Sequence, residues 1–319
     1  MSTSTYLAAY LAGEHERVVQ ELLAIGPAIR EEPIAGDAQA VVQEMMRRAQ
    51  HNIGLIVERL RTLGYRFVSD LPRPEFNPTQ IVERTLAQAQ EQLGYQVPPE
   101  LRAQLDQLAA HMAHQYPQIV ENFKQQAAQW RAEQRLPDPA LAPPVDPVWR
   151  KPDAELEAQV AAIQERYGPL PLVLEAWFAI VGEVDLCGIH PKLSRYVDDA
   201  PEAEQGPFGC PLFVACFSSA EELAALAEDD DTPPDRFEIA PDECHKSGYS
   251  GGAALALPLP TAALDARLIS DDQWNGMYFV DYLRLAFRYG GFPGLHDDAQ
   301  ARDAAQAELA LLTEGLLPL

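Results

Sequence analysis

The segment that most restricts how this chain folds is a proline-rich stretch, LPDPALAPPVDPVWRKPD, at residues 136–153. Proline lacks a backbone N–H donor and has a fixed φ angle, so such a run is incompatible with a helix interior or a central strand. The stretch predicts a stiff, extended linker over residues 136–152, with Trp149 docked on one of the flanking parts. It divides the 319 residues into two candidate domains, 1–135 and 153–319.

Residues 1–135 carry apolar side chains at helical spacing along most of their length. Helices are predicted at about 7–25, 38–63, 77–93 and 101–130. Glycines follow the first two helices, and Asn77-Pro78 is a typical helix start. Pro117 should kink or split the last helix, because it removes one hydrogen bond of the helix. The N-terminal part is therefore predicted to be a helical region with a hairpin arm at about 77–135.

Residues 153–319 mix two periodicities. Helical spacing recurs at 156–163, 174–181, 218–228, 279–287 and 299–313, and short strand candidates lie at 184–187, 212–217, 236–239, 253–257 and 266–269. The strand candidates are bounded by Gly, Pro, Asp and Ser, which favour turns. Because strands and helices do not alternate regularly, the pattern predicts an α+β domain with a mostly antiparallel sheet flanked by helices.

The chain is acidic, with a net charge of −24. Residues 1–151 contain 15 Lys+Arg and 18 Asp+Glu, a net of −3, whereas residues 152–319 contain 9 and 30, a net of −21. Phosphate contacts need clustered Lys and Arg, so nucleic-acid binding by the second half is disfavoured. The charge suits a basic protein partner, or serves only to keep the protein in solution.

The sequence predicts a cytoplasmic protein that does not enter a membrane. No apolar run reaches the roughly 18 residues of a membrane span, and the first residues have no basic region typical of a secretory signal. The four cysteines, Cys187, Cys210, Cys216 and Cys244, have no regular spacing, which favours buried, reduced thiols. The oligomeric state is left open.

Two motifs carry a family resemblance. LPLVLEAWFAIVGEVDLCG, at residues 170–188, has a Leu-Pro helix start, the aromatic pair Trp177-Phe178, the closing Gly182 and then a strand. Together with YFVDYLR at residues 278–284, it resembles the SUKH superfamily, which includes a regulator of cell-wall synthesis and bacterial immunity proteins. Over about residues 153–295, the resemblance implies a non-enzymatic α+β binding domain without catalytic residues.

The function predicted from these features is that of a non-enzymatic protein-binding module, such as a toxin-immunity or scaffold protein. Two candidate contact loops, 196–206 and 242–252, combine acidic and aromatic side chains. Together with the acidic run that follows the 218–228 helix, they give these candidate binding residues: Tyr196, Asp198, Asp199, Glu228, Asp229, Asp230, Asp231, His245 and Tyr249. A further possibility is that the helical half is the functional arm and the second half its docking base.

The alternative hypothesis is a serine hydrolase. GYSGG at residues 248–252 fits the G-x-S-x-G nucleophile motif, with Ser250 as the nucleophile. An acid from Asp265, Asp271 or Asp272 and the base His296 would complete the triad. The motif requires a buried strand before the serine and a helix after it, but here the polar PDECHKS precedes it and AALALPLP follows it. This context favours a glycine-rich turn, so we predict no catalytic residue.

Two further groups of residues are candidate sites. Cys187, His190, Cys244 and His245 include one zinc-like spacing, Cys-x-x-His, but the adjacent Cys244-His245 pair fits poorly. We therefore predict no metal and no cofactor. Arg284 and Arg288, one helical turn apart, either anchor acidic loops such as 228–231 internally or form an anion-binding spot, and the internal role is favoured.

Overall fold

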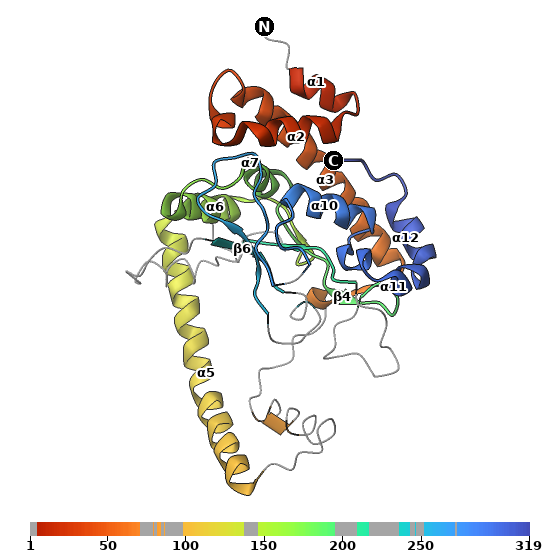
Figure 1. Cartoon of the computed structure of the whole chain (residues 1–319). Coiled ribbons are helices and arrows are strands. Elements are labelled where there is room, and N and C mark those ends of the chain that lie inside the picture. The colour runs from red at the N-terminus through yellow and green to blue at the C-terminus, as the bar shows by residue number, and fades with distance from the viewer. Residues whose placement is uncertain are drawn as a thin grey trace. The chain divides into compact units, whose positions relative to one another are not determined.

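The structure is a computed structural model of the chain, and it describes residues 5–70, 79, 82–83, 86, 98–136, 146–194, 209–216, 236–242, 246, 252–271 and 273–319 (Figure 1). The chain forms two compact units. The larger unit contains Met1–Leu71, Asp138–Ser219 and Asp230–Leu319, and the smaller unit contains Pro72–Pro137 and Ala220–Asp229. The N-terminal helices thus belong with the C-terminal half, which differs from the predicted division at residues 136–152.

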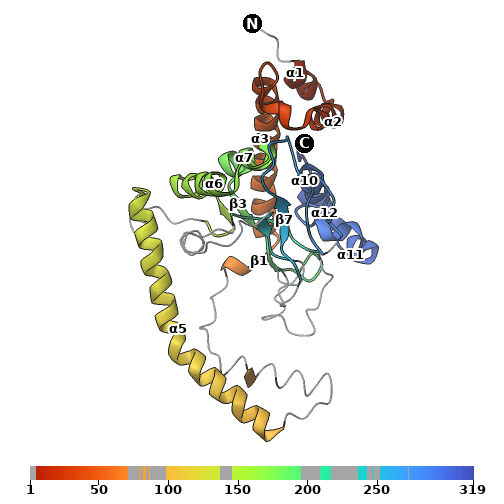
Figure 2. The ribbon, with the colours of Figure 1, turned by 60° about the vertical axis from the view of Figure 1, so that its left-hand side comes forward.

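The long helix α3 explains this division. The chain begins with α1 (Thr5–Leu11), α2 (His15–Ile25), η1 (Gly26–Arg30) and α3 (Ala35–Thr62). The apolar residues of α3 repeat at helical spacing, and Met45, Ile53, Ile56 and Leu60 are fully buried. Figure 2 shows α3 between α7 on one side and α12 on the other. Its buried face is therefore covered by elements that come from far along the sequence.

Polar contacts also join the N-terminal helices to segments in the second half of the chain. Asn52 is fully buried, donates to Leu317 O at 2.9 Å and accepts from Leu317 N at 2.8 Å. Arg59 donates to Leu312 O at 3.0 Å. Arg30 binds the carboxylate of Glu175 at 3.0 Å. These contacts satisfy buried polar groups on both sides, so the two sequence segments form one unit.

The strands are short and pair antiparallel in three small sheets among the described residues. They are β1 (Arg66–Phe67), β2 (Trp149–Arg150), β3 (Glu183–Asp185), β4 (Gly188–Ile189), β5 (Phe213–Val214), β6 (Arg236–Ala240) and β7 (Leu255–Pro258). The pairings are β1 with β4, β3 with both β2 and β5, and β6 with β7. The predicted α+β class is confirmed.

Two segments differ from their predicted form. Trp149 and Arg150, within the predicted linker, form a strand paired with β3, and the Trp149 indole N–H donates to Val181 O at 2.8 Å. The predicted strand 266–269 makes only isolated bridges, Ile269 with Ala256 and Arg267 with Tyr278. Both differences arise because pairing depends on partners distant in sequence.

The second half of the chain also contributes helices to the larger unit. They are α6 (Ala154–Tyr167), α7 (Leu172–Ala176), the π-helical turn η4 (Trp177–Val181), α10 (Phe279–Arg288), η7 (Pro293–His296), α11 (Ala299–Ala304) and α12 (Gln306–Thr313). The predicted burial of Trp177, Phe178, Phe279, Leu283 and Phe287 is confirmed. The single helix predicted at 299–313 is interrupted at Ala305, which separates α11 from α12.

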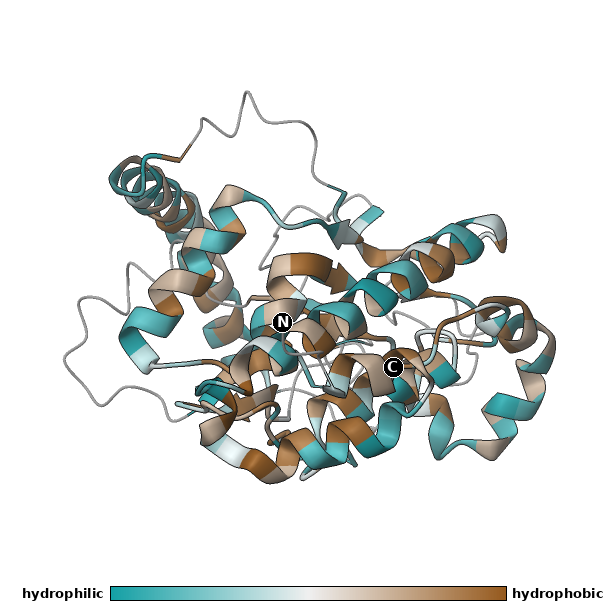
Figure 3. Ribbon diagram, turned by 90° about the horizontal axis from the view of Figure 1, so that it is seen from above, coloured by the Kyte–Doolittle hydropathy of each residue, from teal (hydrophilic) through white to brown (hydrophobic). Residues whose placement is uncertain are grey.

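The smaller unit contains one long described helix, α5 (Pro99–Glu133). Pro117 lies inside it without splitting it, and Figure 2 shows the helix bending in its middle. Figure 3 shows hydrophobic and hydrophilic residues alternating along the helices of the structure. Most of the predicted helix 77–93 and all of 218–228 lie outside the described residues. In the described part of the chain, no helix combines the length and hydrophobicity that a membrane span requires.

Candidate binding cavity

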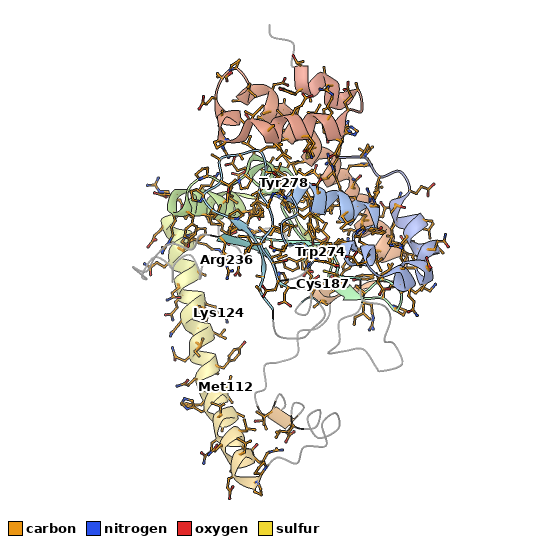
Figure 4. All side chains as sticks on the ribbon, viewed as in Figure 1. Met112, Lys124, Cys187, Arg236, Trp274 and Tyr278 are labelled. Carbon is orange, nitrogen blue, oxygen red and sulfur yellow. The ribbon has the colours of Figure 1, made fainter. Side chains whose placement is uncertain are left out.

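A cavity of about 610 Å³ lies in the larger unit, at the ends of its short strands. Its walls come from the turn η2 (Val68–Asp70), from β3 and the residue pair after it, from β5 and β6, and from the chain before β7. The lining residues are Val68, Asp185, Cys187, Phe213, Arg236, Glu238, Pro241, Asp242, Lys246, Gly252, Ala253 and Ala254. Cys187 and Arg236 are labelled in Figure 4.

Strand pairing positions the cavity walls. In the β3–β5 ladder, Asp185 is paired with Phe213, so a carboxylate and an aromatic ring are neighbours. Along β6, Arg236 and Glu238 are exposed, whereas Phe237 and Ile239 are buried. This alternation follows from the two-residue period of a strand. One face of β6 therefore presents charged side chains to the cavity wall, and the other face contributes apolar side chains to the core.

Lys246 is the most deeply buried charge in the cavity, with 3% of its surface exposed. Its Nζ lies 3.6 Å from Cys210 Sγ and 3.5 Å from the Tyr282 hydroxyl. Burial lowers the pKa of the Lys246 ammonium group, whereas the neighbouring Cys210, Tyr282 and Cys187 raise it, and the net direction is upward. Lys246 therefore contributes a fixed positive charge to the wall.

Asp185 is the carboxylate most affected by its surroundings. Burial raises the pKa of Asp185, and three influences reduce the shift: the Cys187 N–H, which donates to Oδ1 at 2.8 Å, a hydrogen bond with the Cys187 side chain, and the positive charge of Lys246. Burial, together with the nearby Asp185, also raises the pKa of the Cys187 thiol well above its usual value. This thiol is neutral at physiological pH and lacks the lowered pKa of a nucleophilic cysteine.

The far wall is closely packed around Asp242. Gly252 has φ +100°, and a Cβ built on it would lie 3.0 Å from the Asp242 Cγ atom. A larger residue at Gly252 would therefore push against this carboxylate as well as strain the backbone. Lys246 N donates to the Asp242 carbonyl at 3.1 Å, which brings the two charged residues onto the same wall.

Most of the predicted site residues lie outside the described residues. These are Tyr196, Asp198, Asp199, Glu228, Asp229, Asp230, Asp231, His245, Tyr249, Ser250, Asp272 and Cys244. The described residues of the predicted contact loop 242–252 are Asp242, Lys246 and Gly252, and all three line the cavity. Lys246 and Gly252 directly flank residues 247–251, which contain most of the GYSGG motif.

The described residues of the alternative hydrolase triad are not brought together. Asp271 is exposed, and the His296 ring instead contacts the Tyr289 hydroxyl at 3.4 Å and Asp297 at 3.7 Å. Asp265 is buried and accepts hydrogen bonds from Val280 N at 2.8 Å and Ala266 N at 2.7 Å. Its carboxylate therefore holds the first turn of α10 and has no role in orienting His296.

The other candidate groups also have local partners. Cys187 lines the cavity, whereas the His190 ring stacks on Tyr65, with ring centroids 6.2 Å apart. Among the described residues, no group of three or more His, Cys, Asp or Glu residues could hold a metal ion. Arg284 binds Glu16 at 2.8 Å and Asp281 at 3.0 Å, an internal role, but with partners other than the predicted loop 228–231.

Sequence analysis named none of the charged residues that line the cavity as a site residue, although two of them, Asp242 and Lys246, lie in the predicted contact loop 242–252. The others are Asp185, Arg236 and Glu238. One signal was present: Lys246 is one of only 9 basic residues in a segment with 30 acidic ones. The lysine stands in the polar stretch between two predicted strands, where a basic residue facing several carboxylates is a reasonable expectation. The pairing of Asp185 with Phe213, in contrast, has no local sequence signal.

Comparison with known proteins yielded no relative: no protein-family model matches the sequence, and no curated protein or solved structure gives a significant match. The resemblance to the SUKH superfamily therefore stays a prediction that depends on the two short motifs alone.

Proposed function

We propose that this protein is a non-enzymatic binding protein whose cavity accepts a basic side chain of a polypeptide partner. The observation that carries the proposal is the grouping of three carboxylates, Asp185, Glu238 and Asp242, around one cavity. An immunity or scaffold role, as the SUKH resemblance implies, would be a specific form of this function.

The charges of the cavity favour a cation over an anion. The lining contains three carboxylates and two basic residues, a net charge of −1, and one of the basic residues, Lys246, is engaged with Cys210 and Tyr282. The raised pKa of Asp185 reflects a carboxylate that burial deprives of solvation. A cation that enters the cavity would stabilise the charged form of this group.

The apolar part of the lining suits the aliphatic portion of a lysine or arginine side chain. Val68, Phe213 and Pro241 lie on the walls together with Ala253 and Ala254. Long basic side chains commonly bury their methylene groups against such surfaces while their charged ends reach polar partners. The net charge of −21 over residues 152–319 would in addition attract a basic partner from a distance.

A titration with an oligolysine peptide tests the proposal. Glu238→Gln removes one cavity charge from the exposed side of β6, and Asp303→Asn removes one charge from an exposed position on α11. We expect Glu238→Gln to weaken peptide binding about tenfold, or about 1.4 kcal/mol. Asp303→Asn should change it far less. Equal losses in the two variants would contradict the proposal, because they would show attraction by net charge alone.

The pH dependence of the same titration adds a second criterion. Because protonation of Asp185 removes a negative charge from the cavity, peptide affinity should rise as the pH rises through the titration of this group. Asp185→Asn should bind more weakly and should lose this pH dependence. The amide oxygen of asparagine can still accept the hydrogen bond from Cys187 N, so the local fold should persist. An unchanged pH profile in Asp185→Asn would contradict the assigned role.

A further inference from the structure

Arg236 is a charged residue of the cavity that the binding of a basic side chain does not use. It is the first residue of β6, its side chain is exposed, and it belongs to the cavity lining (Figure 4). Across the β6–β7 ladder it is paired with Pro258, which carries no charge. Among the described residues, the Arg236 side chain has no hydrogen-bond or ion-pair partner. This guanidinium group is therefore free to bind an acidic group of a ligand.

The charges of the cavity differ in depth. Asp242 and Lys246 are 8% and 3% exposed, and Asp185 is half-buried, whereas Arg236 and Glu238 are exposed. The inner part of the cavity thus has two carboxylates against one ammonium group, and the outer part has one charge of each sign. A positive group of a ligand is favoured at the inner part, because the net charge there is negative. A negative group is favoured only near Arg236.

Lys246 cannot take over this role. Its Nζ lies 3.6 Å from Cys210 Sγ and 3.5 Å from the Tyr282 hydroxyl, so it already has partners. An anion at the inner part would have to compete with these partners for the ammonium group. It would also lie in a part of the cavity where carboxylates outnumber the positive charge, which is unfavourable.

The spacing along β6 fits a single ligand residue that carries both charges. Arg236 and Glu238 are two positions apart on the same face of the strand, which separates their α-carbons by about 6.5 Å. The four-carbon stem of a lysine side chain separates its α-carbon from its ammonium group by a similar length. A lysine whose carboxylate lies at Arg236 can therefore bring its ammonium group to the carboxylates of the cavity.

In a polypeptide, only the C-terminal residue carries a free carboxylate on the same α-carbon as its side chain. We propose that the cavity binds the C-terminal lysine or arginine of a polypeptide partner, with the basic side chain inside the cavity and the terminal carboxylate on the Arg236 guanidinium group. The fork of guanidinium donors matches the two oxygens of a carboxylate. This inference rests on the proposed function of the cavity and adds the identity of the residue that it accepts.

Two peptides of the same sequence test the proposal by calorimetric titration of the full chain. Both end in lysine, one with a free terminal carboxylate and one with a terminal amide. The amide carries more positive charge, so attraction by the net charge of −24 alone would favour the amide. We expect the reverse, with the carboxylate peptide bound about fivefold more tightly.

Two variants locate the origin of this preference. Arg236→Gln should remove it or reverse it, because the guanidinium partner of the terminal carboxylate is lost. Arg288→Gln removes the same charge from an exposed position on α10, outside the cavity lining, and should keep the preference. Equal or tighter binding of the amide by the wild type, or a carboxylate preference that persists in Arg236→Gln, would overturn the inference.

The amide peptide separates a failure of this inference from a failure of the proposed function. If the preference is absent but Glu238→Gln still weakens binding of the amide peptide, the cavity accepts a basic side chain and the assigned role of Arg236 is wrong. If neither peptide binds the wild type, or if Glu238→Gln binds both peptides as the wild type does, the proposed function fails and this inference fails with it.

Discussion

At the scale of single residues, Arg30 shows how one side chain fixes the packing of distant segments. Its Nε donates to Ala262 O at 2.9 Å, and its Nη2 contacts both Leu170 O and the Glu175 carboxylate. The planar guanidinium group presents its donors in a rigid fork, so one residue can satisfy three acceptors at once. All three partners lie at least 140 residues away along the chain. Arg30 thus ties η1 to α7 and to the loop that follows β7.

We predict that Arg30→Ala lowers the free energy of unfolding by about 2 kcal/mol, because it removes the donor of two carbonyls and leaves the Glu175 carboxylate with only its bond from Gln164 among the described residues. Arg30→Lys should lower the free energy of unfolding somewhat less. The ammonium group keeps the positive charge, but it cannot reproduce the planar arrangement of guanidinium donors. Arg17→Ala is the matched control: among the described residues, the ion pairs of Arg17 are the exposed ones with Glu14 and Glu21. This substitution should lower the free energy of unfolding by less than about 1 kcal/mol.

Denaturant unfolding of the three variants checks this prediction. A loss for Arg30→Ala no larger than that for Arg17→Ala would show that the Arg30 contacts contribute nothing beyond an ordinary surface ion pair.

Asp265 makes the stability of the larger unit depend on pH in a predictable direction. Burial raises the pKa of Asp265 to about 7, and the nearby Asp281 adds to the increase. The hydrogen bonds from Val280 N and Ala266 N lower the pKa but do not outweigh burial. The folded pKa thus lies above the unfolded value of 3.8. The stabilising contribution of the protonated group is therefore complete below about pH 4 and is lost as the pH rises toward 7.

We predict that Asp265 lowers the free energy of unfolding by up to about 4 kcal/mol between pH 4 and pH 7. Asp265→Asn should remove this slope, because asparagine does not titrate. It should also lower stability at acid pH, because the asparagine amide group cannot accept from both Val280 N and Ala266 N as well as a carboxyl group does. The difference between the unfolding free energies of the two proteins, measured across this pH range, isolates Asp265 from the other titrating groups. A difference that does not vary with pH would contradict the prediction.

At the scale of elements, sequence patterns predicted helical faces better than they predicted partners. The spacing of Phe279, Leu283 and Phe287 correctly indicated a buried face of α10. Spacing also indicated the apolar face of α3, but the elements that cover this face, α7 and α12, follow it by more than a hundred residues. Periodicity shows which face of a helix is buried. It carries no information about which other element of the chain covers that face.

Short strands were harder to predict than helices, and the candidate site depends on them. A strand of two residues, such as β5, has no period to detect, and its register with β3 is set by tertiary contacts. The placement of Asp185 beside Phe213 follows from that register, and Glu238 lines the same cavity from β6. The α+β class could therefore be predicted, whereas the cavity charges could not.

The π-helical turn η4 is a further element that the sequence did not predict. Residues 174–181 were predicted as one regular helix, but Trp177–Val181 form a wider turn in which Gly182 N donates to Trp177 O at 2.9 Å. The wider turn allows Trp177 and Phe178 to be buried together, each against a different aromatic partner, Phe279 and Phe237. Here the packing of large aromatic residues overrides the ordinary helical spacing.

At the scale of the whole molecule, the larger unit is assembled from both ends of the sequence. α3 contributes one side of its core, and the segments after residue 138 contribute the rest. The contacts of Asn52 with Leu317 and of Arg59 with Leu312 close this unit near its C-terminus. A fragment that lacks α3 would expose the faces of α7 and α12 that α3 covers.

We therefore predict that residues 138–319 alone do not fold cooperatively, whereas a chain in which a flexible linker replaces residues 72–137 does. The reason is that the second protein keeps every segment of the larger unit and loses only residues 72–137 of the smaller one, whereas the first loses the apolar face of α3 and the buried Asn52. Thermal unfolding followed by circular dichroism separates the two outcomes. Adding a peptide that spans residues 5–70 to the 138–319 fragment should restore a cooperative transition, because the missing face is then supplied in trans. A sharp transition in the isolated 138–319 fragment would contradict the prediction and would favour the domain boundary first suggested by the proline-rich stretch.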